Sequence, residues 1–301
     1  MKKEIKREIP MIADFFCLGN ILGIKDAHGG ANTGFLIRTD RGKYFTKIMT
    51  GAHVAANTEY EAVFANHLFR HEVPSAPYLV SKDGSCVFKN NGIVSVAQKE
   101  IHGVHPAVTL DAVSQVGMIM GKMSLVSLKH LPEKFGWLSR EYVKKEIVLL
   151  RRDFDHDKHA RKIFSALNAH NFFAKNIIPK LPHSIVHADL HTDNVLFRKE
   201  KLIAIIDWED ASVAPALFDF ASSVIYWCFG DEGFRPKIYK AFYNSYTKER
   251  PFTKLEHEYL LDCIQHVAVL QTLWRFLNWE NSRRKGALWA LELPLTEILK
   301  I

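Results

Sequence analysis

The chain has 301 residues, a formal net charge of +7, 48% hydrophobic residues and 24% charged residues. That composition is ordinary for a soluble globular protein, and the length is sufficient for two lobes with a sizeable core. A basic balance suits a polyanionic ligand, but the Lys and Arg residues are spread along the chain, which argues against nucleic acid as a partner. The sequence leaves the oligomeric state open.

Neither a membrane partner nor a structural metal site is expected. No apolar run approaches the roughly 20 residues that a membrane span requires. The apolar stretch near the N-terminus is interrupted by Asp14, which argues against a signal peptide. The four cysteines are widely spaced and contain no CxxC pair. We therefore expect a cytoplasmic protein with reduced cysteines.

Residues 1–101 have the pattern of a β-rich lobe. A short helix is predicted over residues 11–22, and a longer helix over 58–71 ends before Val73-Pro74. Five segments rich in β-branched and aromatic residues are separated by turn-forming residues and predict an antiparallel sheet. The predicted strands are FLIRT (35–39), KYFTKIM (43–49), PYLVS (77–81), SCVFKN (85–90) and IVSVAQKEI (93–101). The predicted N-terminal lobe therefore has five strands and one main helix.

Residues 102–301 begin with a linker, HGVHP, and are mostly helical. A short strand, SIVHA, and a hairpin formed by VLF and LIAIID interrupt the helices, and Thr253 with Glu256 forms a capping box that begins a long helix. Amphipathic helices are predicted near 109–128, 139–151 and 158–178. A β-rich lobe followed by a mostly helical lobe predicts an α+β fold of the bilobal, protein kinase-like type.

Two polar motifs follow apolar, strand-like segments, HADLHTDN (187–194) and IIDWED (205–210). Asp189 and Asn194 are five residues apart, a spacing that lets the carboxylate face an acceptor hydroxyl while the carboxamide turns toward magnesium. Asp207 follows an apolar strand and would add a second magnesium ligand at the strand end. Each Asp alone could be a loop-capping residue, but the combination favours phosphoryl transfer with Asp189 as the catalytic residue.

Two histidines and one aspartate near these motifs have more than one interpretation. His187 either contacts the transferred phosphate or fixes the loop backbone, and the second role is favoured. His191 either lines the acceptor pocket or is a solvated loop residue. Asp219 in LFDFA is expected to be structural, since an acidic residue at a helix start can accept hydrogen bonds from loop amides.

The expected cofactors are ATP and Mg²⁺, and the N-terminal lobe offers residues for ATP. Lys47 alternates with apolar residues on a predicted strand and would pair with phosphates, with Glu61 of the next helix as its ion-pair partner. The alternatives are a solvent-facing lysine and a capping-box role for Glu61 with Thr58. The loop HGGANTG could bring backbone amides to phosphate, and the strand end before the linker could contact adenine. The residues concerned are Gly29, Gly30 and Asn32 in the loop and Gln98, Lys99 and Ile101 at the strand end.

The acceptor site is predicted from residues of the helical lobe. Aromatic residues at helical spacing are more often core residues, but some could form the wall of a pocket for a small polar molecule. Arg275 lies within an apolar helix, which suggests a carboxylate partner from the protein or the substrate. Acidic side chains beside the magnesium-binding Asp could complete the pocket. The candidates are His191, Glu209, Asp210, Tyr226, Trp227, Trp274 and Arg275.

With these motifs the chain resembles the aminoglycoside phosphotransferase and choline kinase-like superfamily. The matching segments are HADLHTDNVL (187–196), IDWEDA (206–211) and DFA (219–221). Further similarity to the homoserine kinase-like branch lies in YWC (226–228), RPFT (250–253) and WRF (274–276). The resemblance implies that Asp189 is catalytic, that Asn194 and Asp207 bind magnesium, and that Lys47 and Glu61 serve nucleotide binding.

The sequence therefore predicts an ATP- and Mg²⁺-dependent kinase that acts on the hydroxyl of a small molecule. Homoserine or a similar amino alcohol is the first expected acceptor, and an aminoglycoside, choline or ethanolamine is the alternative. A kinase-fold pseudoenzyme that binds a nucleotide or a partner without catalysis is the alternative of a different class. The predicted division assigns nucleotide binding to residues 1–101, and the catalytic loop, magnesium and acceptor site to residues 102–301.

Overall fold

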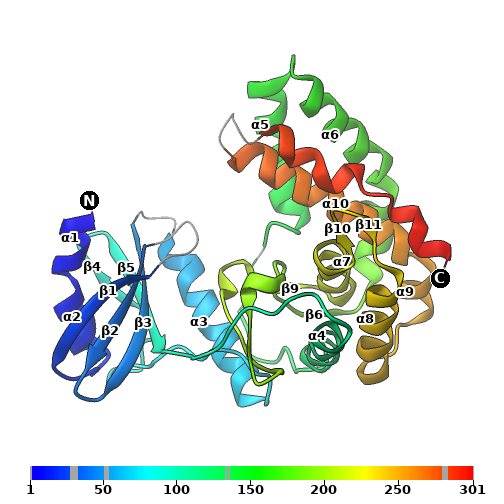
Figure 1. Cartoon of the computed structure of the whole chain (residues 1–301). Helices are drawn as coiled ribbons and strands as arrows, with labels where there is room; N and C mark the ends of the chain where they lie inside the picture. Colours follow the sequence, from blue (N-terminus) through cyan, green and yellow to red (C-terminus); the bar gives the residue numbers. More distant parts are fainter. Residues whose placement is uncertain are drawn as a thin grey trace. The chain divides into compact units, whose positions relative to one another are not determined.

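The computed structural model describes residues 2–27, 33–50, 54–132, 134, 136–279 and 284–300. The chain forms two compact units (Figure 1). The first unit comprises Met1–Val104 together with Ile203–Glu209, and the second comprises His105–Leu202 and Asp210–Ile301. The segment that contains Asp207 therefore belongs to the first unit. Within the described residues, no helix has both the length and the apolar character of a membrane span.

The first unit is built on a five-stranded antiparallel sheet with the strand order β1-β2-β3-β5-β4. Strands β1 to β3 pair in sequence order, and β4 pairs with β5. The helix α3 (Val54–Arg70) lies between β3 and β4 in the sequence. The strands are β1 (Ile21–Ala27), β2 (Thr33–Thr39), β3 (Gly42–Thr50), β4 (Phe88–Asn90) and β5 (Ile93–Lys99).

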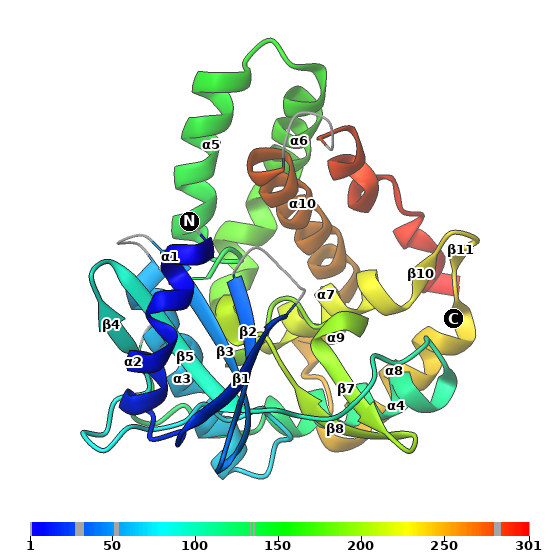
Figure 2. The same ribbon diagram turned by 60° about the vertical axis from the view of Figure 1, so that its left-hand side comes forward.

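Helices cover the two faces of this sheet, as Figure 2 shows. Side chains alternate between the faces of a strand, so neighbouring residues of β3 belong to different layers. Tyr44 and Ile48 pack in a core with α1 (Lys2–Arg7) and α2 (Ile9–Phe15). Lys47, on the opposite face, contacts α3. This alternation explains how a lysine between apolar neighbours is buried beside α3.

Two sequence-based assignments in the first unit are wrong. The helix expected over residues 11–22 ends at Phe15, and Ile21–Ala27 is an edge strand. PYLVS (77–81) is not a strand and contributes only a bridge between Tyr78 and Gln98. Pro77 has no N–H to donate, which disfavours a place in the sheet ladder. The predicted number of strands is nevertheless correct, because β1 takes the place of PYLVS.

The second unit is mostly helical, and its centre is α7 (Ala216–Trp227), which is buried along nearly its whole length. The helix α7 packs against α10 (Leu260–Asn278) and the strand β6 (His183–Val186). Its remaining strands are β7 (Val195–Arg198), β9 (Ser212–Pro215), β10 (Phe229–Gly230) and β11 (Gly233–Phe234). The strand β8 (Lys201–Ile205) begins in the second unit and ends in the first.

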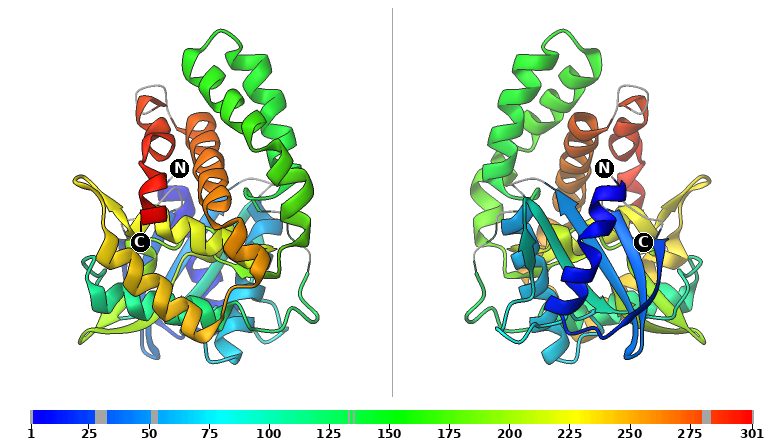
Figure 3. Two further views of the ribbon diagram at one scale, coloured as in Figure 1. Left: turned by 90° about the vertical axis from the view of Figure 1, so that its right-hand side faces the viewer. Right: turned by 90° about the vertical axis from the view of Figure 1, so that its left-hand side faces the viewer.

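Further helices surround this centre, and α5 and α6 form a helical hairpin beside α10 (Figure 3). The helix predicted over 158–178 ends at Ala169, and a π-helical turn over Phe173–Ile177 follows it. The capping box of Thr253 and Glu256 is present, but it begins a short helix that precedes α10. The outer helices are α4 (Leu110–Met123), α5 (Arg140–Phe154), α6 (Lys158–Ala169), α8 (Pro236–Glu249) and α9 (Lys254–Glu258).

Two glycines four residues apart on α4 allow α8 to approach closely. A Cβ atom at Gly117 would lie 2.7 Å from the Phe242 carbonyl oxygen, and one at Gly121 would lie 2.7 Å from the Tyr246 carbonyl oxygen. Any larger residue at either position would therefore meet the backbone of α8.

Candidate active site

The loop after β6 is held in place by a buried carboxylate from α7. Asp219 Oδ2 accepts a hydrogen bond from the His187 amide at 2.9 Å, and Asp219 Oδ1 accepts one from the Ala188 amide at 2.8 Å. Ala188 has a positive φ of 69°, which a non-glycine residue rarely adopts. His187 is fully buried, and its Nδ1 accepts a hydrogen bond from the Asp189 amide at 3.3 Å. These contacts support structural roles for His187 and Asp219.

Asp189, the predicted catalytic residue, is oriented by three side chains. The Tyr226 hydroxyl donates to Asp189 Oδ1 at 2.7 Å, and His191 Nε2 lies 3.3 Å from Asp189 Oδ2. Asn194 Nδ2 donates to the Asp189 carbonyl oxygen at 2.8 Å. Burial acts to raise the pKa of Asp189, but hydrogen bonds from His191 and Tyr226, together with the charges of His191 and His187, outweigh it, so the pKa is lowered. Asp189 is therefore ionised at neutral pH.

Lys47 in the first unit is surrounded by three carboxylates. Its Nζ lies 3.2 Å from Glu61 Oε1, 3.0 Å from Asp207 Oδ1 and 2.7 Å from Glu209 Oε2. The Tyr78 hydroxyl also donates to Glu61. Burial acts to lower the pKa of Lys47, but the three carboxylates outweigh it and raise the pKa. Lys47 is thus a buried, permanently charged ammonium group.

Asp207 lies at the end of β8 in a left-handed backbone conformation, with φ of 61°. This conformation is uncommon for a residue other than glycine, and such residues cluster at functional sites. Asp207 in the first unit and Asn194 in the second each carry an oxygen donor of the kind that Mg²⁺ prefers. Glu209, a predicted acceptor residue, lies in the first unit, where it forms the ion pair with Lys47.

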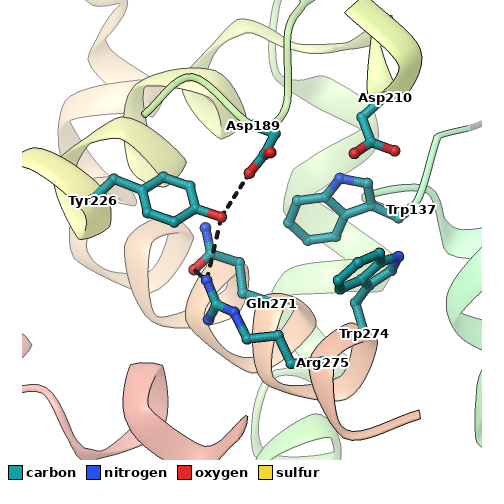
Figure 4. Close-up of a pocket in the computed structure, with 7 residues that line it drawn as sticks. All are labelled: Trp137, Asp189, Asp210, Tyr226, Gln271, Trp274 and Arg275. Carbon is teal, nitrogen blue, oxygen red and sulfur yellow. Dashed lines mark hydrogen bonds between the residues drawn. The ribbon is translucent and has the colours of Figure 1, made fainter. Parts of the chain in front are cut away.

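A pocket with an empty volume of about 310 Å³ lies in the second unit. Figure 4 shows that Asp189 and Tyr226 form one side of it, with Arg275 and two indole rings facing them. The lining residues are Trp137, Asp189, Asp210, Tyr226, Gln271, Trp274 and Arg275.

Four of the seven predicted acceptor residues line this pocket: Asp210, Tyr226, Trp274 and Arg275. Trp227 does not, because it is fully buried and its indole N–H donates to the Leu190 carbonyl at 2.9 Å. His191 contacts Asp189 and packs its ring against Tyr226, with 5.2 Å between the ring centroids.

Two lining residues, Trp137 and Gln271, were not predicted from the sequence. Gln271 lies four residues before Arg275 on α10 and therefore shares its helix face, so its spacing from Arg275 could have indicated it. Trp137 lies in a loop without periodicity, so no local pattern marks it.

Arg275 is nearly buried, with 8% of its surface exposed. Its Nη2 donates to the Tyr226 hydroxyl at 3.2 Å and to Gln271 Oε1 at 3.4 Å, whereas its Nη1 has no hydrogen-bond partner in the described chain. The guanidinium carbon lies between 5.2 and 5.8 Å from the ring centroids of Tyr226, Trp279 and Trp289.

The remaining nucleotide-site predictions stay predictions. Gln98 and Lys99 end β5, where they pair with Phe45 and Tyr44 of β3, and Ile101 follows the strand. The three loop residues predicted to approach phosphate lie outside the described residues: Gly29, Gly30 and Asn32.

Comparison with known proteins adds independent information on the family. A model described as the phosphotransferase enzyme family matches residues 24–252. The homoserine kinase of Bradyrhizobium diazoefficiens is 26% identical over 297 residues, which cover 96% of this chain and 90% of that protein. The homoserine kinase of Rhodopseudomonas palustris is 28% identical over 262 residues, which cover 81% and 75%.

Solved structures with similar folds include a kinase and a phosphotransferase. An amicoumacin kinase in complex with AMP-PNP and Ca²⁺ superposes with a TM-score of 0.71 at 14% identity, covering 100% of this chain and 96% of the other. A spectinomycin phosphotransferase in complex with ADP and spectinomycin superposes with a TM-score of 0.65 at 17% identity, covering 97% and 96%. The predicted α+β, protein kinase-like fold class is confirmed.

Proposed function

The chain belongs to the phosphotransferase enzyme family, and from this premise we propose that it transfers a phosphoryl group from ATP, with magnesium, to the hydroxyl of a small molecule. Homoserine or a similar amino alcohol is the first proposed acceptor, because homoserine kinases match nearly the whole chain. The observation that carries the proposal is the ionised Asp189 carboxylate at the wall of a small pocket.

In the proposed mechanism, Asp189 accepts a hydrogen bond from the acceptor hydroxyl and aims its oxygen at the γ-phosphorus. The acceptor oxygen forms a bond to phosphorus as the bond between phosphorus and the leaving oxygen of ADP breaks, and the hydroxyl proton passes to Asp189. Tyr226 and His191 hold the carboxylate in position, which is the main requirement of a reaction governed by alignment.

Lys47 is proposed to bind the phosphates of the nucleotide. Its charge is fixed by Glu61, a buried partner that keeps the ammonium in place when a ligand replaces the more exposed carboxylates of Asp207 and Glu209. Asn194 and Asp207 are proposed to hold magnesium, which when bound neutralises charge on the phosphates.

The proposal is tested by measuring ADP release from ATP and MgCl₂ over a panel of acceptors. The panel contains L-homoserine, other amino alcohols, choline, ethanolamine and aminoglycosides, because Asp210 and the two indoles would suit any ammonium-bearing acceptor. We expect turnover with L-homoserine or a close analogue. Replacing Asp189→Ala should lower kcat by at least about 100-fold, since positioning and proton transfer each contribute that much.

Asp193→Ala is the matched control, because this aspartate lies in the same loop and its side chain is 75% exposed. We expect that control to keep normal turnover. Unchanged turnover in Asp189→Ala would contradict the catalytic assignment. Nucleotide binding without ADP release for any acceptor would instead favour the pseudoenzyme.

A further inference from the structure

Among the residues that the structure describes, Arg275 is a buried cation with no carboxylate in ion-pair contact. Within the described chain, Arg275 makes hydrogen bonds only to the neutral groups of Tyr226 and Gln271, and its Nη1 has no partner. Buried charges in proteins are normally paired, because removing a lone ion from water is costly. The side chain lines the pocket that contains Asp189, so the missing partner can come from a ligand.

Two other buried cations follow the usual rule. Lys47 pairs with the buried Glu61 at 3.2 Å, and Arg250 pairs with the buried Glu256 at 2.8 Å. Around Arg275, aromatic rings take the place of a carboxylate. Ring faces stabilise a cation through their quadrupole but do not neutralise its charge. The pocket therefore retains a positive charge that can pair with an anion.

We propose that Arg275 binds the carboxylate of the acceptor, and that the acceptor is a hydroxy amino acid. This inference rests on the proposed phosphotransferase function of the same pocket. Guanidinium groups are well suited to carboxylates because their planar array of donors matches two oxygens. A purely cationic acceptor, such as choline or an aminoglycoside, would instead be repelled by Arg275.

The spacing of the polar groups fits a short molecule. The Tyr226 hydroxyl lies 2.7 Å from Asp189 Oδ1 and 3.2 Å from Arg275 Nη2, so one oxygen atom bridges the hydroxyl-binding and carboxylate-binding groups. A hydroxy amino acid with a short side chain spans such a separation. In Figure 4 the carboxylate of Asp210 and the rings of Trp137 and Trp274 lie on another side of the pocket, where they would receive the ammonium group.

The first arm of the test uses the unmodified enzyme. We compare kcat/KM for L-homoserine, its carboxamide and 3-aminopropan-1-ol, which lacks the carboxyl group. Loss of the negative charge should lower kcat/KM by about 10- to 100-fold, as expected for a hydrogen-bonded charged group. The effect should lie mainly in KM, because the carboxylate is remote from the reacting hydroxyl. Equal kcat/KM values for the three compounds would overturn the proposal.

The second arm uses Arg275→Met and Arg275→Lys. Arg275→Met should lower kcat/KM for L-homoserine about 10- to 100-fold more than for 3-aminopropan-1-ol, because that compound has no carboxylate to lose and reports only the loss of the hydrogen bond to Tyr226. Arg275→Lys should recover part of the loss. If Arg275 has only a structural role, its replacement lowers kcat/KM for both compounds by the same factor, and that result would overturn the proposal. Poor folding of the Met variant also lowers both values by one factor, so the ratio of the two values still decides.

Arg151→Met is the matched control. Arg151 is an exposed arginine of the second unit that also stacks on an aromatic ring, with 4.5 Å to the Phe164 centroid, and it does not line the pocket. We expect the control to keep the preference for the carboxylate. Phosphorylation of choline or aminoglycosides but not of hydroxy amino acids would overturn this inference alone, whereas no phosphorylation of any acceptor would count against the proposed function.

Discussion

At the scale of single residues, the second unit places titratable groups in apolar surroundings. His266 on α10 is 5% exposed, and its Nδ1 has no hydrogen-bond partner in the described chain. The rings of His170, Phe173 and Phe218 surround it, with centroids at 5.5 to 6.0 Å. Burial, with a smaller contribution from His170, lowers the pKa of His266 to about 3. His266 is therefore neutral in the folded protein.

This shift predicts a loss of stability in mild acid. The unfolded chain binds a proton on this residue near pH 6.5, whereas the folded chain does so only near pH 3, so the free energy of unfolding falls as the pH decreases through that window. Between pH 7 and pH 5 the loss from His266 alone should be about 2 kcal/mol. Urea unfolding at pH 7 and pH 5 measures the loss of stability in each protein. The loss in His266→Phe should be smaller than in the unmodified protein by this amount. An identical pH dependence in the two proteins would contradict the assignment.

At the scale of elements, the contact between α4 and α8 depends on the absence of side chains. Gly117 and Gly121 lie on one face of α4, and a Cβ atom at either position would approach a carbonyl oxygen of α8 at 2.7 Å. Intrinsic helix propensity would favour alanine over glycine by about 1 kcal/mol. The close contact between the added Cβ atom and the carbonyl oxygen of α8 opposes this gain in helix propensity. The contact cannot be relieved easily, because a backbone oxygen cannot rotate away as a flexible side chain can.

Gly121→Val should therefore destabilise the protein by about 1–3 kcal/mol or more, the usual cost of overpacking a tight contact. Thermal or urea unfolding measures the change. Lys122→Ala is the control, because this residue is exposed on the same helix and should change stability little. Stabilisation by valine, or by alanine at the same position, would show that α4 and α8 can separate without cost.

At the scale of the whole molecule, local patterns predicted the fold class and the family. The confirmed family follows from motifs such as HADLHTDN, in which the characteristic spacing lies within a few residues. The edge strand Ile21–Ala27 was missed because it is largely exposed and lacks a strong apolar alternation. Edge strands with one exposed face leave a weaker signal than central strands such as β3.

The parts of the candidate site that the sequence did not predict depend on tertiary packing. Glu209 and Asp210 are neighbours in sequence, yet one pairs with Lys47 of the sheet and the other lines the pocket. Trp137 reaches the pocket from a loop whose position no local pattern specifies. Local spacing therefore defines the loop motif, whereas tertiary packing decides which residues line the pocket.

The proposed cofactors predict a change in the stability of the whole chain. Because a ligand that binds only the folded state stabilises it, ATP with MgCl₂ at about 100 times Kd should add about 2.7 kcal/mol to the free energy of unfolding. A thermal shift assay measures this effect, and EDTA should remove the part that depends on magnesium. The Asp207→Ala variant should lose the magnesium-dependent part of the thermal shift, whereas the control Asp193→Ala should keep it. A magnesium effect that persists in Asp207→Ala would contradict the role of Asp207 as a ligand.

The aromatic residues around Arg275 have a practical consequence for the study of this protein. Four of the six tryptophans of the chain line the pocket or surround the guanidinium, namely Trp137, Trp274, Trp279 and Trp289. The other two, Trp208 and Trp227, are fully buried and hydrogen-bonded to backbone carbonyls. Changes at the proposed acceptor pocket or at Arg275 should therefore alter the intrinsic fluorescence of the protein. Titration of a small molecule can be followed by indole emission, with no label and no turnover, so that occupancy can be measured separately from chemistry.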